Sequence, residues 1–327
     1  MSKEGLGMGC SMLFKTNNKL FEYAELTAAT NFNSVKPTLR VVETQHIIPF
    51  LGTELYNSLN AAYTSATDEA TLTAQQTALL DQCRCVIGPM LCYYYAPKAE
   101  VKLSDSGAQR METTNAKTAY QNQVTNYREQ NLREGEMATE NLLQFLEDNK
   151  GDYPQWTAST AFTDYRSLFI KSGGEFNKIF PSGSPYRNYW AMRSQMTDVE
   201  ESTVRSLLGD TIYNALKAKG QGAEDFTAKE ADLLSRLKRL IAYQTLVYAI
   251  PLLNVRIDAN GITVMSLNHA LNDNLRSRVA AGKDDLNVII EKCQAAANSW
   301  KKNVTDFLNA NATEFTGWPL SPELVEG

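Results

Sequence analysis

The sequence predicts a mainly α-helical protein with two tandem duplicated helical domains, each carrying a small β-hairpin. Two observations lead to this prediction. The 327 residues contain one pattern twice in the same order. In each copy, apolar residues recur at steps of three and four, the period of an amphipathic helix. The length suits two domains of ordinary size, and a composition of 43% hydrophobic and 21% charged residues is typical of globular proteins.

The duplication is seen as identities at a nearly constant spacing. Residues 42–59 match residues 199–216, and residues 73–107 match residues 227–261. Each copy then closes on a Phe-Leu pair followed by a tryptophan. The clearest matches are Leu51-Gly52 with Leu208-Gly209, Tyr56-Asn57 with Tyr213-Asn214, Pro97 with Pro251, Phe145-Leu146 with Phe307-Leu308, and Trp156 with Trp318. Identities in this order and spacing indicate a tandem duplication.

The repeats are predicted to form two domains, at residues 12–150 and 160–320. The helical pattern is broken between them at residues 149–154, which include glycine, aspartate and proline. Residues 1–11 contain three glycines and are expected to form a flexible arm. Residues 321–327 are expected to form a tail.

A capped helix is predicted at the centre of each copy. Each begins with threonine and has Gln or Glu three residues on, which is a capping-box pattern, and each is expected to stop at a proline. These residues are Thr73, Gln76 and Pro97 in the first copy, and Thr227, Glu230 and Pro251 in the second. A shorter helix precedes each and ends at Gly52 or Gly209, because glycine adopts the turn past a helix end without a Cβ clash.

A change of period after each proline predicts a β-hairpin at residues 99–111 and 253–265. Apolar residues there alternate, and Asp, Asn or Gly occupies the turn. A lone two-stranded ribbon is marginal in water and needs support from a helix or a neighbouring subunit. Its apolar residues are therefore candidates for an interface with a neighbouring subunit: Val101 and Leu103, then Val255, Ile257, Ile262 and Val264. Long helices at about 114–148 and 268–311 are expected to complete the two domains.

A second candidate contact is the loop at residues 182–187, which contains Tyr186 and Arg187. Tyrosine and arginine are enriched at the centres of protein interfaces. A stacking site for nucleic-acid bases would need more lysine and arginine around the aromatic residues. We therefore interpret the loop as a protein contact.

The sequence predicts no catalytic residue, no cofactor and no metal site. It has only two histidines, His46 and His269, and five cysteines, which are interpreted as free thiols. It has no phosphate-binding loop, nucleophile elbow or dinucleotide fingerprint. Carboxylate pairs such as Glu200-Glu201 and Glu134 with Glu136 are expected on solvated helix faces. No stretch is apolar enough to span a membrane, and the net charge of −5 disfavours nonspecific nucleic-acid binding.

The repeated motifs carry a family resemblance. In order they are Leu51-Gly52-x-x-Leu55-Tyr56-Asn57, a capped helix ending at Pro97, Val101-x-Leu103-x-x-x-Gly107, and a long helix closing on residues 141–147 and Trp156. Over residues 13–318 the chain resembles a tandem family from phages and prophages of Bacteroidetes, whose genes lie among virion structural genes. Each half is also similar to the small helical head–tail connector (adaptor) proteins of tailed phages.

The resemblance implies a noncatalytic structural protein of the virion neck, assembled in the host cytoplasm. Its implied role is that of a head–tail connector or adaptor subunit that joins portal to tail. The implied partners are further copies of the chain in a ring, twelvefold by resemblance, together with the portal protein and other neck or tail proteins. DNA passing through the lumen without sequence recognition is a further implied contact.

Three alternatives stay open at the level of sequence. The first is that the subunit is a tail-completion protein or another ring component of the virion. An enzyme or small-ligand protein would have a pocket between the halves, lined by converging polar residues. An adaptor or regulator that acts in the host cytoplasm is the third. The sequence shows no converging polar cluster, and fold alone does not establish function.

Overall fold

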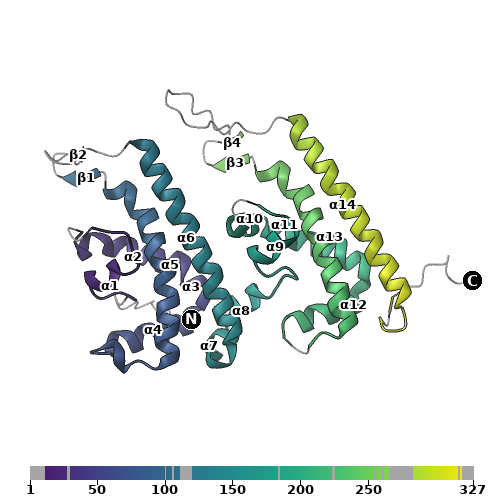
Figure 1. The fold of residues 1–327 in the computed structure, drawn as a ribbon, viewed down its shortest axis with the longest axis horizontal. Helices are drawn as coiled ribbons and strands as arrows, with labels where there is room; N and C mark the ends of the chain where they lie inside the picture. The colour runs from purple at the N-terminus through teal and green to yellow at the C-terminus, as the bar shows by residue number, and fades with distance from the viewer. Residues whose placement is uncertain are drawn as a thin grey trace, which may run out of the picture. The chain divides into compact units, whose positions relative to one another are not determined.

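The structure is a computed structural model. It describes residues 12–27, 30–99, 101–104, 107–110, 120–182, 185–222, 225–253, 255–258, 261–264, 283–315 and 317–318. The chain divides into two compact units, Met1–Tyr165 and Arg166–Gly327. Both are mainly helical (Figure 1), so the helical, tandem-duplicated fold that the sequence predicts is confirmed.

The first unit is built on two long helices that pack along each other, α5 (Ala74–Ala99) and α6 (Gln121–Asp148). Helix α2 (Phe32–His46) packs on α5, and the side chains buried between these helices form the core. The shorter elements are α1 (Asn17–Phe21), α3 (Ile48–Leu51), α4 (Thr53–Ser65), η1 (Glu69–Thr71), η2 (Lys150–Asp152), α7 (Pro154–Thr157) and α8 (Thr160–Tyr165).

The second unit repeats this plan with α13 (Ala228–Leu253) packed along α14 (Lys283–Ala310). Two shorter helices, α10 (Pro185–Ala191) and α11 (Arg193–Val199), stand where the first unit has the single helix α2. The remaining elements are α9 (Gly173–Ile179), the π-helical turn η3 (Glu200–Val204) and α12 (Arg205–Gly220). A continuous cluster of buried apolar side chains from these helices forms the core.

In each unit, one two-stranded antiparallel sheet occurs in the stretch of sequence that joins the two long helices. In the first unit β1 (Val101–Ser104) pairs with β2 (Gly107–Arg110). In the second β3 (Val255–Asp258) pairs with β4 (Gly261–Val264). In Figure 1 each pair extends from the end of its long helices.

Both predicted capping boxes are present. The Thr73 hydroxyl accepts from the Gln76 backbone N–H at 3.2 Å, and the Gln76 side chain accepts from the Thr73 N–H at 3.0 Å. Thr227 and Glu230 form the same pair of bonds at 3.2 and 2.8 Å. These reciprocal bonds satisfy backbone donors that have no partner within the helix.

The expected helix ends at Pro97 and Pro251 are corrected by the structure, because α5 and α13 each continue two residues past the proline. A proline in the last turn of a helix removes one backbone N–H donor and so costs one hydrogen bond of the helix. The helix can still continue for the two residues that follow. The expected domain boundary is also shifted. Residues 150–165 belong to the first unit, where the Trp156 indole N–H donates to the Phe50 carbonyl at 2.9 Å.

The two glycine corners share one backbone conformation. Gly52 has φ 78° and ψ 154°, and Gly209 has φ 73° and ψ 160°. This region of φ and ψ is open almost only to glycine, so each helix–Gly–helix corner depends on it. Among the described residues, no helix is long and apolar enough to cross a membrane.

Candidate functional site

The predicted hairpin residues lie in the four strands. Val101 and Leu103 lie in β1. In the second unit the register pairs Val255 with Val264 and Ile257 with Ile262. The structure describes these strands by their backbone, so the side chains of the six predicted residues lie outside what it describes.

Exposed apolar side chains gather beside the second hairpin. Tyr248 and Leu252, which are 42% and 56% exposed, lie in the last turns of α13 before β3. Val288 and Ile289, 48% and 41% exposed, lie in the first two turns of α14. Because α13 and α14 pack along each other and are joined through the hairpin, these four residues and the hairpin share one end of the helix pair.

The same end of the first unit has one exposed aromatic side chain, Tyr120 before α6, which is 76% exposed, but it is polar at the positions that match Tyr248 and Leu252. Tyr94, which matches Tyr248, is half-buried, and its hydroxyl lies 3.0 Å from His46 Nε2. Lys98, which matches Leu252, donates to the Thr38 hydroxyl at 3.0 Å. The two units thus differ in surface chemistry at equivalent positions, and the second presents the apolar version.

The expected loop is corrected for Tyr186 and Arg187, which lie on α10 and are half-buried. The helix begins at Pro185, a residue that fits the first position of a helix. The Tyr186 ring is 6.0 Å from the Trp190 ring, and α10 packs against α9 and α11. The hairpin instead continues directly from α13. The two predicted sets of contact residues therefore lie on different elements.

Sequence reasoning missed a buried glutamate in each unit. Glu43 and Glu200 are matched residues of the duplication, and they are only 2% and 1% exposed. Glu43 accepts from the Leu13 backbone N–H at 2.9 Å, and Glu200 accepts from the Phe169 N–H at 2.8 Å. The expectation that Glu200 lies on a solvated face is therefore wrong, as it is for Glu136, which is also buried.

These bonds reveal that the duplication extends further toward the N-terminus of each unit. Residues 12–14 and 168–170 are buried in both units. The Thr16 hydroxyl then caps α1 by accepting from the Lys19 N–H, and Ser172 caps α9 by accepting from the Glu175 N–H. The segment that begins each unit therefore has the same structure in both, a buried stretch followed by a capped helix, although few of its residues are identical.

The second contact of the buried glutamate differs between units. In the first, the Tyr56 hydroxyl donates to Glu43 Oε2 at 2.8 Å. In the second, the Lys217 ammonium forms a close ion pair with Glu200 and also donates to the Ser167 carbonyl at 2.6 Å. Lys217 occupies the position of the buried Asn60 in the first repeat.

Burial raises the pKa of both carboxyl groups. The pKa of Glu43 rises to about 7, because loss of solvent outweighs the hydrogen bonds from Leu13 and Tyr56. The pKa of Glu200 is also raised by burial, and the Lys217 charge opposes that shift. The first unit thus buries a carboxyl that gains a proton near neutral pH, whereas the second buries an ion pair.

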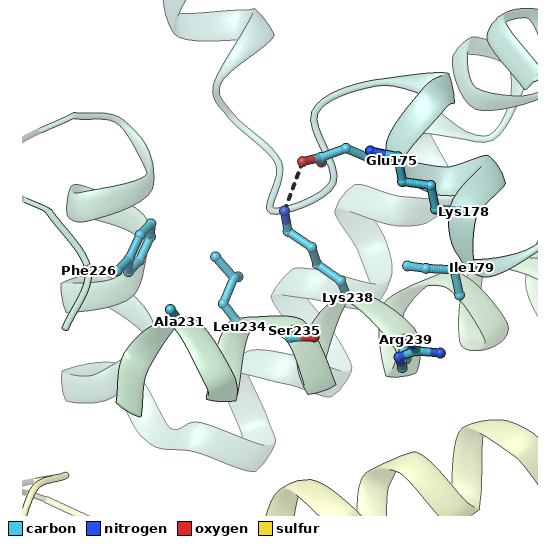
Figure 2. A pocket seen from close by; sticks show the side chains of 9 residues that line it. All are labelled: Glu175, Lys178, Ile179, Phe226, Ala231, Leu234, Ser235, Lys238 and Arg239. Carbon is cyan, nitrogen blue, oxygen red and sulfur yellow. Dashed lines mark hydrogen bonds and ion pairs between the residues drawn. The ribbon is translucent and has the colours of Figure 1, made fainter. Parts of the chain in front are cut away.

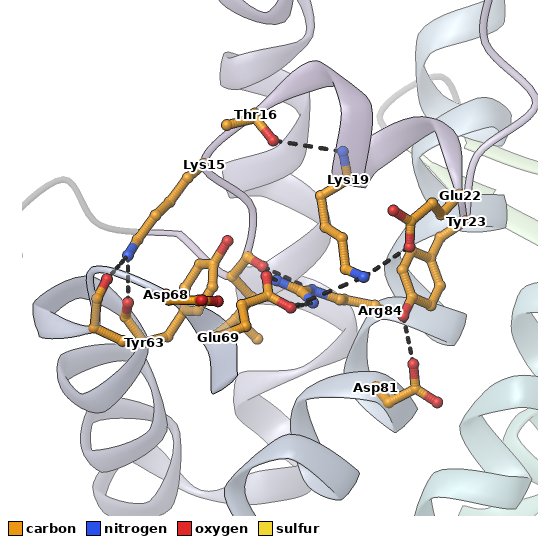
Figure 3. A network of polar contacts seen from close by, with 12 residues as sticks. Lys15, Thr16, Lys19, Glu22, Tyr23, Tyr63, Asp68, Glu69, Asp81 and Arg84 are labelled. Atoms are coloured by element: carbon orange, nitrogen blue, oxygen red, sulfur yellow. Dashed lines mark hydrogen bonds and ion pairs between the residues drawn. The ribbon is translucent and has the colours of Figure 1, made fainter. Parts of the chain in front are cut away.

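A polar network surrounds Arg84 in the first unit (Figure 3). The guanidinium binds both oxygens of Glu69, at 3.0 and 2.6 Å, and donates to the Leu13 carbonyl at 3.1 Å. Lys19 lies 3.9 Å from the same carboxylate, and the Arg84 hydrogen bond holds the pKa of Glu69 below its usual range. Glu69 belongs to the connector between α4 and α5, so a carboxylate of the chain itself occupies this cationic position.

The matching region of the second unit contains two neighbouring cavities. Lys238, the counterpart of Arg84, pairs with Glu175 at 3.0 Å (Figure 2). That ion pair, with Phe226 and Leu234, lines both cavities, whose volumes are about 320 Å³ and 250 Å³. The larger adds Lys178, Ile179, Ala231, Ser235 and Arg239, and the smaller adds Arg166, Leu168, Phe169, Lys171, Lys217 and Gly220.

Two thiols of α5 and the described histidine lie in packing positions, and a third thiol is at the surface. Cys83 and Cys92 are buried and Cys85 is exposed, and all three are free. Burial raises the pKa of each of these thiols and lowers the pKa of His46. His269 and Cys10 lie outside the described residues. Within the described part of the chain, no three His, Cys, Asp or Glu side chains are grouped to hold a metal ion.

Two stretches of the chain, residues 47–166 and 204–326, match the family DUF6712, a family of unknown function. No curated protein matches the chain, and no solved structure does. The two matched stretches cover well over half of the sequence and correspond to the two repeats. The chain therefore belongs to DUF6712, and it carries two copies of the region that defines this family.

Proposed function

We propose that this protein is a noncatalytic ring subunit of the virion neck, a head–tail connector that joins portal to tail. The observation that carries the proposal is a two-stranded hairpin at the end of the long helix pair in each unit, flanked in the second unit by Tyr248, Leu252, Val288 and Ile289. The resemblance to small helical connector proteins supports the role in the neck.

The physical argument concerns the strand edges. Each described sheet has two strands, so within that part of the chain every strand is an edge strand with backbone groups available for pairing. A two-stranded ribbon is barely stable alone, and a strand or helix of another chain can complete it. Exposed apolar side chains beside the ribbon would add the burial that makes such a contact stable.

The occupant that we propose for the second hairpin is an adjacent copy of the chain. A ring repeats one contact between identical subunits. The two hairpins differ in their surroundings, since four exposed apolar side chains flank the second, whereas Tyr94 and Lys98 beside the first make polar contacts. Unlike surfaces of this kind suit a head-to-tail contact between neighbouring copies. The portal is the proposed partner on the ring face, with other neck or tail proteins opposite it.

The test uses Leu252→Asp combined with Val288→Asp, which places charge in the apolar patch without changing the core. Val41→Asp is the matched control, because Val41 is an exposed apolar residue on α2. We expect the double variant to lose ring assembly, measured by mass photometry and negative-stain imaging with the portal protein present. The control should assemble as the unchanged protein does, and all variants should keep their helical circular dichroism.

A deletion of residues 257–263 tests the hairpin itself. Helix content should be retained while ring formation or attachment to the neck is lost. Normal assembly of the deletion variant would reduce the hairpin to a connector between helices. A protein that forms no ring, with or without portal, would instead favour a ligand-binding protein or a regulator. A ring that binds tail but not portal would identify a tail-completion component.

A further inference from the structure

The two repeats stay in register past the ends of their last long helices. Asn149 and Asn311 each donate through Nδ2 to a phenylalanine carbonyl one turn earlier, both at 2.8 Å. Trp156 and Trp318 then follow at the same distance along the chain. Each residue after Trp156 therefore has a counterpart at the same distance after Trp318.

In the first unit, the segment after Trp156 forms α8, which covers the indole. The Ser159 hydroxyl precedes this helix and accepts from the Phe162 backbone N–H at 3.2 Å. The Phe162 ring lies edge-on at 4.9 Å from the Trp156 ring, and the Tyr165 ring lies at 6.1 Å. Trp156 is 0% exposed, so α8 helps to complete the core of its unit.

In the second unit, Trp318 is held in place but is less covered. Its indole N–H donates to Asn309 Oδ1 at 2.8 Å, and its ring packs against the core while staying half-buried. A Cβ at the preceding Gly317 would lie 3.4 Å from the Thr211 Cβ. Thr211 comes directly after the corner at Gly209, so the chain reaches Trp318 beside this corner, as it does in the first unit.

The sequence after Trp318 repeats the features that form α8. Residues 319–327 lie outside the described residues. In both copies a serine follows the tryptophan after three residues, and an apolar residue follows it after six. In the second copy these are Ser321 and Leu324, with Pro322 between them. Serine is a preferred N-cap and proline a preferred first residue of a helix, so this pattern predicts a helix start at the position of α8.

The family comparison supports the same equivalence. The region that defines DUF6712 extends past the tryptophan in both copies, to residue 166 in the first and to residue 326 in the second. The first of these stretches includes α8. The segment after Trp318 is therefore part of the repeated unit.

We propose that residues 321–327 are the counterpart of α8 and dock on the Trp318 indole of their own chain, with Leu324 in the place of Phe162. An isolated helix of this length is marginal in water, so it depends on the surface that it covers. Burial of Leu324 against the indole supplies the stabilisation. This surface is separate from the hairpin contact, because the hairpin precedes α14 and Trp318 follows it.

One difference sets the centre of the contact. In the first unit Ala161 is buried, and its Cβ lies 3.9 Å from a Cβ placed at Gly52. Its counterpart is Glu323, whose longer, charged side chain keeps the segment further from the corner at Gly209. The Trp318 indole is therefore the centre of the surface, and the glycine is not.

The experiment uses the full chain labelled with 5-fluorotryptophan. The four tryptophans give four ¹⁹F signals, and the signal missing from Trp318→Phe identifies that residue. In Leu324→Asp we expect the Trp318 signal to move and to gain a shift between H₂O and D₂O, because its ring becomes exposed. The other three signals should stay in place, which shows that both units remain folded.

Two further variants make the test specific. Val325→Asp is the matched control, because the counterpart of Val325 is Thr163, which is exposed. It should leave all four signals unchanged. Leu324→Phe introduces the residue that the first unit has at this position and should keep the Trp318 ring covered. In the unchanged protein, nuclear Overhauser effects should connect the Leu324 methyl groups with the Trp318 ring.

Three results would overturn the proposal. The first is a Trp318 signal that does not respond to Leu324→Asp. The second is an equal response to Leu324→Asp and Val325→Asp, which would show an effect of charge without a docked face. The third is a Trp318 signal that depends on protein concentration, which would show that the segment docks on a neighbouring copy instead of its own chain.

Discussion

Glu43 and Glu200 illustrate two ways of burying one carboxyl group. A charge removed from water is costly unless it is neutralised or paired. In the first unit, burial favours the protonated form of Glu43, whose pKa is about 7. In the second unit Lys217 supplies the opposite charge to Glu200. Both carboxyl groups still bind the backbone of the segment that begins the unit.

The raised pKa of Glu43 predicts that the first unit loses stability as pH rises. In the unfolded chain this carboxyl has the ordinary glutamate pKa of 4.5, whereas in the folded chain its pKa is about 7. Between these values the native state holds a proton that the unfolded state has released. The free energy of unfolding therefore falls with rising pH, by up to about 1.4 kcal/mol per pH unit.

The variant Glu43→Gln isolates this effect. Glutamine is neutral at every pH, so the variant should gain about 2–3 kcal/mol relative to the unchanged protein between pH 5 and pH 8. The measurement is urea unfolding read by pulse-labelling hydrogen exchange of peptides from α2 and α5, with labelling at one fixed pH. Because the lowered pKa of His46 acts in the opposite direction, the comparison must be between the two proteins. If the free energy of unfolding depended on pH in the same way in both proteins, the prediction would be contradicted.

The ion pair of the second unit should respond differently. Lys217→Met leaves Glu200 buried without its cation, and we expect a loss of about 3–5 kcal/mol. Adding Glu200→Gln removes the stranded charge and should recover much of that loss. Denaturant unfolding of the two single variants and the double variant forms a double-mutant cycle. Additive effects would show that the two side chains do not depend on each other.

The sequence shows that Glu43 and Glu200 match, but it does not show that they are buried. Adjacent charged residues such as Glu200 and Glu201 usually lie on a solvated face. Of these two residues only Glu201 is exposed, and it pairs with Arg205 at 2.9 Å. One signal in the sequence could have indicated this burial: both copies have a glutamate at the same position, directly after a valine.

At the scale of the element, the glycine corners set the angle between two helices in each unit. A residue with a Cβ at φ near 75° is strained in either corner. The surroundings differ, because a Cβ at Gly52 would lie 2.8 Å from the Ser159 Cβ, whereas none of the described atoms lies within 4 Å of one at Gly209.

This difference predicts unequal effects of the same substitution. Gly209→Ala should cost about 1–3 kcal/mol from backbone strain alone. Gly52→Ala should cost more, because Ser159 or the corner must also move. Thermal unfolding of the two variants tests which one loses more stability. An equal loss of stability in both would show that Ser159 moves aside at no cost.

The sequence predicts the helices well where local signals and periodicity agree. Thr73 and Thr227 mark helix starts because their capping bonds join neighbours in the chain. The equivalence of residues 12–20 and 168–176 was not visible, since it depends on burial and on bonds to distant glutamates. The cationic site of the first unit was missed for the same reason: Glu69 and Arg84 meet only in the folded chain.

At the scale of the whole molecule, each unit has its own core and its own long helix pair. A fragment of residues 1–165 should therefore fold alone and unfold cooperatively in urea. It should give the hydrogen-exchange protection of α5 and α6 that the full chain gives. A fragment that lacks protected amides would show that the first unit depends on the second.

The unequal partners of the two buried glutamates also have an evolutionary consequence. A lysine at position 217 depends on Glu200, because an ammonium that is largely removed from water, 16% exposed here, is disfavoured without a counter-charge. The glutamate does not need the lysine, as Glu43 and Asn60 show. Across DUF6712, the lysine should therefore occur only in copies that retain the glutamate, whereas the glutamate should occur with or without it.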